Sequence, residues 1–117
     1  MRNLLFFAII LMVQIVSAQM ESQSINDFIG LDTSKEILLD VRTPQEFSEG
    51  HIKGALNIDW LSNSFNHRVS FLDKSKKIYV YCKMGGRSLK SQSRLKELGF
   101  KNVVDLEGGF DSYSKKD

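Results

Sequence analysis

The stretch at residues 38–58, LLDVRTPQEFSEGHIKGALNI, decides the fold of this chain. Its start belongs to an apolar run, residues 37–41, which predicts a strand buried on both faces. The segment 43–46, Thr-Pro-Gln-Glu, has the spacing of a capping box with Pro at the first helical position, and therefore predicts a short helix that stops at Gly50. Residues 54–58 predict a second strand. Strand, helix and strand in succession are typical of a parallel sheet.

Helical spacing of apolar residues predicts two further helices on either side of this stretch. The earlier helix is capped by Ser24, and its apolar face consists of Ile25, Phe28 and Ile29. The later one lies within residues 60–72, and we expect its core-facing side chains to be Trp60, Leu61, Phe65, Val69 and Leu72.

Two more β-prone runs complete the alternation. Residues 78–81 and 103–106 predict strands, and a helix between them begins near Arg87 and ends at Gly99. The whole pattern predicts an α/β fold whose parallel sheet is covered by helices on both faces. Ligands bind beyond the carboxyl ends of the strands in such sheets, and Cys82 comes directly after residues 78–81.

Length and composition exclude several classes of protein. The 117 residues favour a single domain, and 42% hydrophobic with 26% charged residues is typical of a globular protein rather than a disordered chain or a membrane bundle. Sixteen Lys and Arg against 14 Asp and Glu leave a formal charge of +2, too small to indicate a nucleic-acid partner.

The amino-terminal residues 1–18 have the layout of a signal peptide. Arg2 precedes an apolar run at residues 4–13, and small residues follow up to Ala18, after which we expect cleavage. The mature protein would then be periplasmic or secreted, without membrane contact. An uncleaved membrane anchor is the alternative. Cys82 is the single cysteine, so no intramolecular disulfide can form.

The segment 82–88, Cys-Lys-Met-Gly-Gly-Arg-Ser, carries the candidate chemistry. Backbone N–H groups of a tight glycine-containing loop, together with a helix amino end, make a cradle for anions, and a thiolate in that cradle is stabilised. Cys82 is therefore the candidate nucleophile. The candidate substrate-binding residues are Lys83, Met84, Gly85, Gly86 and Arg87.

Other interpretations of these residues are less specific. A cysteine can be an inert buried side chain, and two glycines alone indicate a turn. Arg42 and Glu46 are expected to form a surface ion pair, and Asp40 to accept hydrogen bonds from backbone N–H groups. No catalytic role is assigned to His51, which follows a turn glycine.

Residues 38–58, the loop that begins at Cys82 and the Gly-Gly-aromatic segment 108–110 together resemble the rhodanese-like domain family. The resemblance covers residues 24–113 and implies a five-stranded parallel sheet with helices on both sides. It implies that Cys82 carries sulfur and that residues 83–87 form the substrate loop. Many members have Trp where this chain has Phe110.

The mechanism implied by the resemblance is a covalent relay. The Cys82 thiolate attacks the outer sulfur of an anionic donor such as thiosulfate, and a thiol or cyanide then takes the sulfur from the resulting persulfide. Neither a metal nor an organic cofactor is required. The expected enzyme is a monomeric thiosulfate sulfurtransferase, with a redox or sulfur-relay protein as a further partner.

Two alternatives remain open at this point. One is a persulfide or sulfide carrier that depends on a partner protein for turnover. The other is a Cys-dependent phosphatase or arsenate reductase, a branch of the same superfamily whose loop is one residue longer. The span from Cys82 to Arg87 is six residues inclusive, which resembles the sulfurtransferase pattern.

Overall fold

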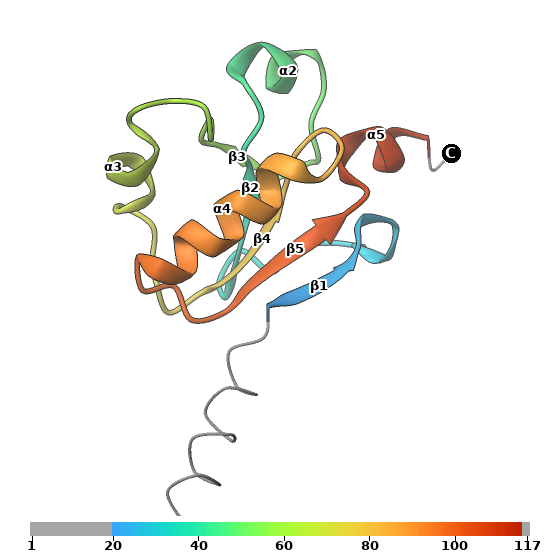
Figure 1. The fold of residues 1–117 in the computed structure, drawn as a ribbon. Coiled ribbons are helices and arrows are strands. Elements are labelled where there is room, and N and C mark those ends of the chain that lie inside the picture. The colour runs from blue at the N-terminus through green and yellow to red at the C-terminus, as the bar shows by residue number, and fades with distance from the viewer. Residues whose placement is uncertain (1–19, 116–117) are drawn as a thin grey trace, which may run out of the picture.

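A computed structural model describes residues 20–115, so the predicted signal peptide lies outside the described residues. Five strands form one sheet in the order β1-β5-β4-β2-β3, and every pairing is parallel (Figure 1). The strands are β1 (Glu21–Ser24), β2 (Glu36–Asp40), β3 (Leu56–Asn57), β4 (Lys77–Tyr81) and β5 (Val103–Glu107). The helices are η1 (Ile25–Asp27), α2 (Pro44–Glu49), α3 (Phe65–Val69), α4 (Gly86–Glu97) and α5 (Gly109–Ser114).

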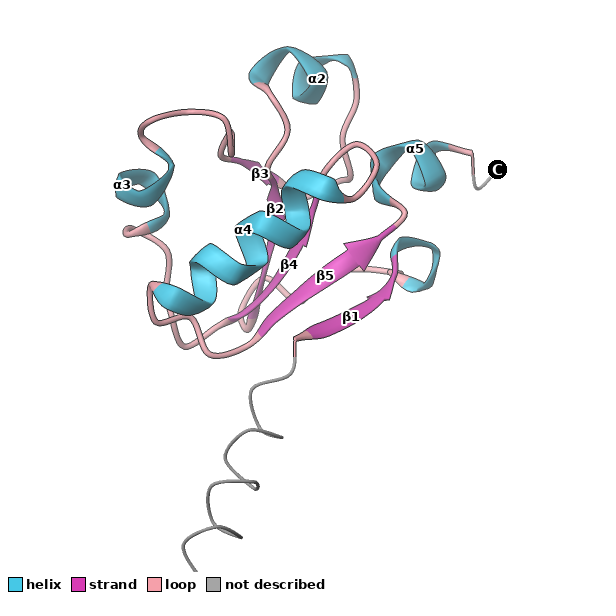
Figure 2. Ribbon diagram, viewed as in Figure 1, coloured by secondary structure: helices cyan, strands magenta, loops and turns pink. Residues whose placement is uncertain are grey.

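The sheet has an apolar cluster on each face, which confirms the predicted α/β architecture with helices on both sides (Figure 2). Successive side chains of a strand point to opposite faces, so β5 contributes Val103 to one cluster and Val104 to the other. The first cluster packs with α3 and α4 and includes Leu39, Val69, Val80, Leu95 and Phe100. The second packs with η1 and α5 and includes Ile25, Phe28, Leu38, Tyr81 and Leu106.

The predicted capping box forms at the start of α2. The Thr43 hydroxyl accepts a hydrogen bond from the Glu46 backbone N–H at 3.2 Å, and the Glu46 carboxylate accepts one from the Thr43 backbone N–H at 3.0 Å. Pro44 is the first helical residue, where its missing N–H costs nothing. This helix is specified by residues next to one another in the chain.

The prediction of an amino-terminal helix after Ser24 is wrong for most of the helix. Ser24 does cap η1, a single 3-10 turn, but Ile29 is 94% exposed and does not face the core. The polar residues Glu21–Ser24 instead form β1, which pairs with β5. Pairing with a distant strand supplies hydrogen bonds that the local sequence does not predict.

The helix predicted within residues 60–72 is shorter than expected. It covers Phe65–Val69, and its first and last residues, Phe65 and Val69, are buried as predicted. Leu61, which was also expected to face the core, is 65% exposed. The Leu61 backbone N–H donates to the Asp59 carboxylate at 2.9 Å, because an Asp side chain there offers the backbone a turn in place of a helix. Trp60 and Leu72 pack partly buried against the first apolar cluster.

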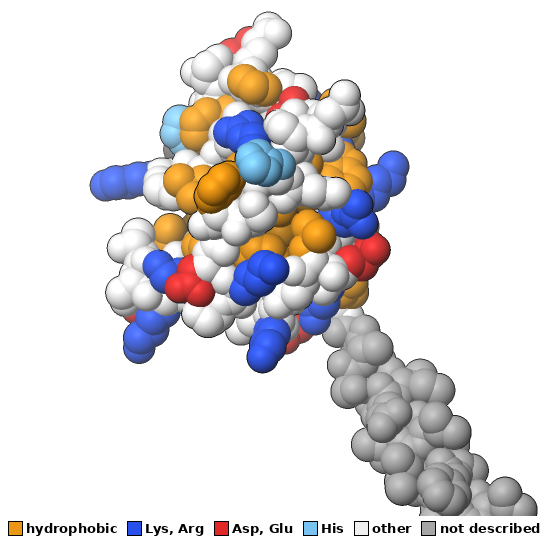
Figure 3. Space-filling model, turned by 90° about the vertical axis from the view of Figure 1, so that its left-hand side faces the viewer, with side chains coloured by type: hydrophobic (Ala, Val, Ile, Leu, Met, Phe, Trp, Pro, Cys, Tyr) orange, Lys and Arg blue, Asp and Glu red, His pale blue; other side chains and the backbone are white. Residues whose placement is uncertain are grey.

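The side of the molecule that carries α3 shows several apolar side chains between charged ones (Figure 3). Leu61 and Phe71, which flank α3 in sequence, are 65% and 77% exposed. Within residues 20–115, no helix has the length and hydropathy needed to cross a membrane.

Candidate active site

Cys82 lies directly after β4, the middle strand of the sheet, and only 1% of it is exposed. Its Sγ accepts a hydrogen bond from the backbone N–H of Gly85 at 3.0 Å. The φ angle of Gly85 is +135°, a conformation that favours glycine and turns this N–H back toward the sulfur. The structure therefore places the predicted nucleophile at the carboxyl edge of the sheet, inside a tight loop.

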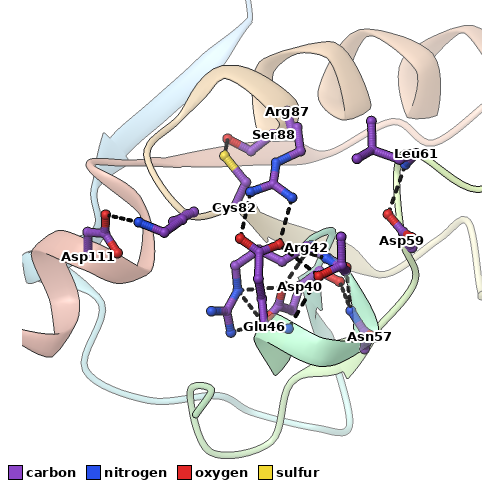
Figure 4. Close-up of polar contacts among 12 residues, drawn as sticks. Asp40, Arg42, Glu46, Asn57, Asp59, Leu61, Cys82, Arg87, Ser88 and Asp111 are labelled. Carbon is purple, nitrogen blue, oxygen red and sulfur yellow. Dashed lines mark hydrogen bonds and ion pairs between the residues drawn. The ribbon is translucent and has the colours of Figure 1, made fainter. Parts of the chain in front are cut away.

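Ser88, in the first turn of α4, is a second polar neighbour of the sulfur (Figure 4). Its Oγ lies 3.5 Å from the Cys82 Sγ and donates a hydrogen bond to the Gly85 carbonyl at 3.0 Å. The 12-residue helix α4 begins at Gly86, so its positive amino end is directed to this loop. A negative charge on sulfur is thus met by the Gly85 N–H and the helix dipole, whereas the Ser88 hydroxyl donates its proton to the Gly85 carbonyl.

The beginning of α5 holds the loop in place from the other side. The Phe110 backbone N–H donates to the Cys82 carbonyl at 2.8 Å, and the Asp111 N–H donates to the Lys83 carbonyl at 3.1 Å. Gly109 precedes them with φ +68°, and a Cβ atom on it would lie 2.4 Å from the Lys83 carbonyl oxygen. The glycine pair before Phe110 therefore permits this close approach, and the aromatic segment supports the nucleophile through its backbone.

Arg87 turns toward α2 and forms a two-point ion pair with Glu46. Its Nη1 and Nη2 lie 2.8 Å and 3.0 Å from the two carboxylate oxygens, and each side chain is 24% exposed. Hydrogen bonding by Arg87 lowers the pKa of Glu46 to about 2, and Glu46 in turn raises the pKa of Arg87. The guanidinium that the sequence assigns to an anionic substrate already has a carboxylate partner.

Lys83 also has a partner, since its Nζ lies 2.8 Å from the Asp111 carboxylate. This pair is about half exposed, so water weakens it more than the pair made by Arg87. Met84 is 75% exposed at the outer tip of the loop.

The prediction of a surface ion pair between Arg42 and Glu46 is wrong. Arg42 is 3% exposed and pairs with the fully buried Asp40, with Nη2 2.7 Å from Oδ2. The same Nη2 donates to the Gly50 carbonyl at 2.7 Å, and the guanidinium carbon lies 4.4 Å from the ring centroid of Phe110. Asp40 accepts the Arg42 backbone N–H at 2.9 Å, as predicted. A buried carboxylate, a backbone carbonyl and an aromatic ring thus contact Arg42 in place of Glu46.

Asp105 on β5 is a buried carboxyl that the sequence did not single out. It is 1% exposed, and its Oδ1 accepts no hydrogen bond from the described residues. Burial raises the pKa of Asp105, the Ser88 hydroxyl lowers it in part, and Glu107 raises it further. Asp105 is therefore a hydrogen-bond partner of Ser88, and it lines a hollow together with Gly85 and Gly86 of the cysteine loop.

The predicted site residues 82–87 lie together between the end of β4 and the first turn of α4, and Glu46, Ser88, Phe110 and Asp111 contact them. Ser88 could have been found from the sequence, because it follows Arg87 in the first turn of the predicted helix. The sequence predicted other roles for Glu46 and Phe110, a helix cap and an aromatic element, because no local pattern indicates contacts 41 residues before Arg87 and 28 residues after Cys82.

The chain is a parallel α/β domain, and its buried cysteine stands at the carboxyl edge of the sheet, at the start of the six-residue segment 82–87. This arrangement is typical of a class of cysteine-dependent group-transfer proteins. The family model of the rhodanese-like domain matches residues 24–116, and the chain belongs to this family. The family and its named relatives support sulfur transfer in general as the activity.

Three comparisons illustrate the relationship. The chain is 38% identical over 87 residues to thiosulfate sulfurtransferase 16, chloroplastic, of Arabidopsis thaliana, covering 66% of this chain and 72% of that protein. It resembles the crystal structure of a rhodanese-related protein from Thermoplasma volcanium, with a TM-score of 0.71 at 31% identity. The match covers 82% of this chain and 92% of that protein. It also matches 15% of a NAD-dependent persulfide reductase from A. fulgidus with a TM-score of 0.60 at 29% identity, over 77% of this chain.

Proposed function

We propose that this protein moves a sulfane sulfur from a donor such as thiosulfate to a thiophilic acceptor, through a persulfide on Cys82. The observation that carries the proposal is the position of the Cys82 Sγ, which accepts the Gly85 N–H at 3.0 Å at the head of a six-residue loop. A persulfide anion is longer than a thiolate by one sulfur atom, and the Gly85 N–H together with the amino end of α4 suits its charge.

The two steps balance without any added oxidant. The Cys82 thiolate attacks the outer sulfur of the donor, the sulfur–sulfur bond of the donor breaks, and its former partner leaves with the electron pair. In the second step a thiol or cyanide attacks the outer sulfur of Cys82 and regenerates the thiolate. We further propose that the acceptor is either a small thiophile or a redox or sulfur-relay protein, and that the chain acts after export.

Mass spectrometry of the intact protein tests the proposal directly. Incubation with thiosulfate or a hydropersulfide should add one sulfur atom, located on Cys82 by peptide mapping and removed by dithiothreitol. Cys82→Ser should neither gain this mass nor transfer sulfur to cyanide. Transfer at the parent rate by Cys82→Ser would refute the assignment of the nucleophile.

A phosphatase assay distinguishes the competing enzyme class. The same preparation is given an aryl phosphate, with Cys82→Ser as the blank. We expect turnover of the phosphate to be far below sulfur transfer, because the six-residue loop leaves few inward N–H donors for a tetrahedral group. Phosphate turnover above sulfur transfer would assign the protein to the phosphatase branch.

A further inference from the structure

The charged residues beside the cysteine loop include more carboxylates than cations. A hollow of about 250 Å³ lies beside Lys83 and Phe110, and its charged lining residues are Arg42, Glu46, Glu49, Lys83 and Asp111. With the ion-pair partners Asp40 and Arg87 included, three cations face four carboxylates. The neighbourhood has a formal charge of −1 before the cysteine itself ionises.

Each of the three cations is already bound to a carboxylate. Arg42 is held by Asp40 in the protein interior, and Lys83 by Asp111 at the rim. The pair of Arg87 with Glu46 is partly buried and makes two parallel contacts, the strongest form of such a pair. Because the pKa of Glu46 is lowered to about 2, this carboxylate is ionised throughout the neutral range.

We propose that Glu46 is a specificity-determining residue that holds Arg87 away from incoming anions, so that the site favours sulfur donors of low charge, such as alkyl hydropersulfides, over thiosulfate. This inference rests on the proposed sulfur transfer at Cys82. Thiosulfate is a doubly charged anion, and it must either displace Glu46 from Arg87 or approach Glu46 and Glu49 without a free counter-charge. A hydropersulfide of an uncharged thiol carries at most one negative charge, so both penalties are smaller for it than for thiosulfate.

The chemistry with such a donor is balanced. The Cys82 thiolate attacks the outer sulfur of R–S–SH, the donor's S–S bond breaks, and the new S–S bond forms on Cys82. The leaving R–S⁻ takes the proton of the outer sulfur, so that R–SH departs and Cys82 carries the persulfide anion. The total charge is unchanged, and no separated anion has to leave through the acidic rim.

The test compares how fast Cys82 acquires sulfur from thiosulfate and from the hydropersulfide of 2-mercaptoethanol. The two donors differ in intrinsic reactivity, so the measured quantity is the change in each rate between variants. Glu46→Gln keeps a residue that can complete the capping box but removes the charge that holds Arg87. We expect loading from thiosulfate to rise about tenfold, the usual worth of a charge-assisted contact, and loading from the hydropersulfide to change less than about twofold.

Three further variants sharpen the result. Arg87→Ala should lower thiosulfate loading about tenfold in the Glu46→Gln background and only slightly in the parent protein, because in the parent the guanidinium is occupied. Asp111→Asn releases Lys83 at an exposed site and should raise thiosulfate loading even if Glu46→Gln folds poorly. Glu97→Gln makes the same charge change at the far end of α4, and we expect it to alter neither rate.

The outcomes separate this inference from the proposed function. If Cys82 gains sulfur but Glu46→Gln and Asp111→Asn leave thiosulfate loading unchanged, the donor preference is wrong and sulfur transfer stands. If Glu97→Gln raises thiosulfate loading as much as Glu46→Gln does, net charge and not Arg87 is responsible, and the role of Glu46 is refuted. If neither donor loads Cys82, the proposed function fails and the inference fails with it.

Discussion

Asp105 shows how a single buried charge affects this fold. Its carboxyl is almost inaccessible to water, yet its Oδ1 has no hydrogen-bond partner among the described residues. Burial raises its pKa above the ordinary value, and the nearby Glu107 adds to the effect. The folded protein therefore binds the Asp105 proton more tightly than the unfolded chain does. Stability falls as pH rises from the unfolded pKa through the folded pKa.

We expect Asp105→Asn to stabilise the protein above the pKa of the unfolded carboxyl, because the raised pKa of the folded carboxyl lowers stability there. The amide keeps the shape and can donate to the Ser88 hydroxyl. A rise of a few degrees in Tm is expected, the shift that about 1 kcal/mol produces in a domain of this size. The gain should shrink as the pH falls and should be lost below the unfolded pKa of about 3.9, because the carboxyl is then protonated in both states. Thermal unfolding across this pH range measures the effect, and a gain independent of pH would contradict its electrostatic origin.

The link between α5 and the cysteine loop is the most constrained contact between elements. The amino end of α5 donates two backbone hydrogen bonds to the carbonyls of Cys82 and Lys83. Those bonds require the chain at Gly109 to pass closer to the loop than any side chain permits. A helix at the carboxyl end of the domain thus fixes the geometry of the nucleophile.

Gly109→Ala should break this link. The added Cβ would meet the carbonyl oxygens of Lys83 and Cys82 at 2.4 Å and 2.8 Å, at a φ of +68°. We expect a loss of about 3 kcal/mol or more in the free energy of unfolding, together with slower loading of Cys82. Chemical denaturation measures the first effect. Gly30→Ala is the matched control, since a Cβ there meets no atom within 4 Å, and equal stability of the two variants would refute the constraint.

What the sequence predicts depends on the range of the interactions. The helix α2 was predicted because Thr43, Pro44 and Glu46 act on one another locally. The cysteine loop was predicted because its residue types suit one chemistry. The exposure of Leu61 and the strand β1 were missed, because a side-chain turn and a distant strand decide them. The partners of Arg87 and Lys83 were also missed, since no local pattern indicates which distant carboxylate meets a cation.

At the scale of the whole molecule, the described residues form one folded domain whose first strand, β1, begins at Glu21. With cleavage after Ala18, Glu21 is the third residue of the mature chain. The edge strand β1 would then follow almost immediately after the new amino terminus. A retained leader would instead place the domain directly beside a membrane anchor.

We expect the mature protein to begin at Gln19 and to be found outside the cytoplasm. The basic Arg2, the short apolar run and the small residues before Gln19 together form the processing signal. Amino-terminal sequencing of the protein from its native compartment measures the cleavage. Ala18→Arg should block it and leave the full-length chain, whereas full-length wild-type protein in the cytosol would count against export.

The central position of β4 bears on how the nucleophile behaves while the rest of the molecule fluctuates. β4 is bonded to β2 on one side and to β5 on the other, while β1 and β3 each have one neighbour in the sheet. Partial unfolding is expected to begin at such edge strands and to leave the hydrogen bonds of the central strands intact. The backbone amides of β4 should thus exchange with deuterium last, and the sulfur should keep its position through every opening short of global unfolding.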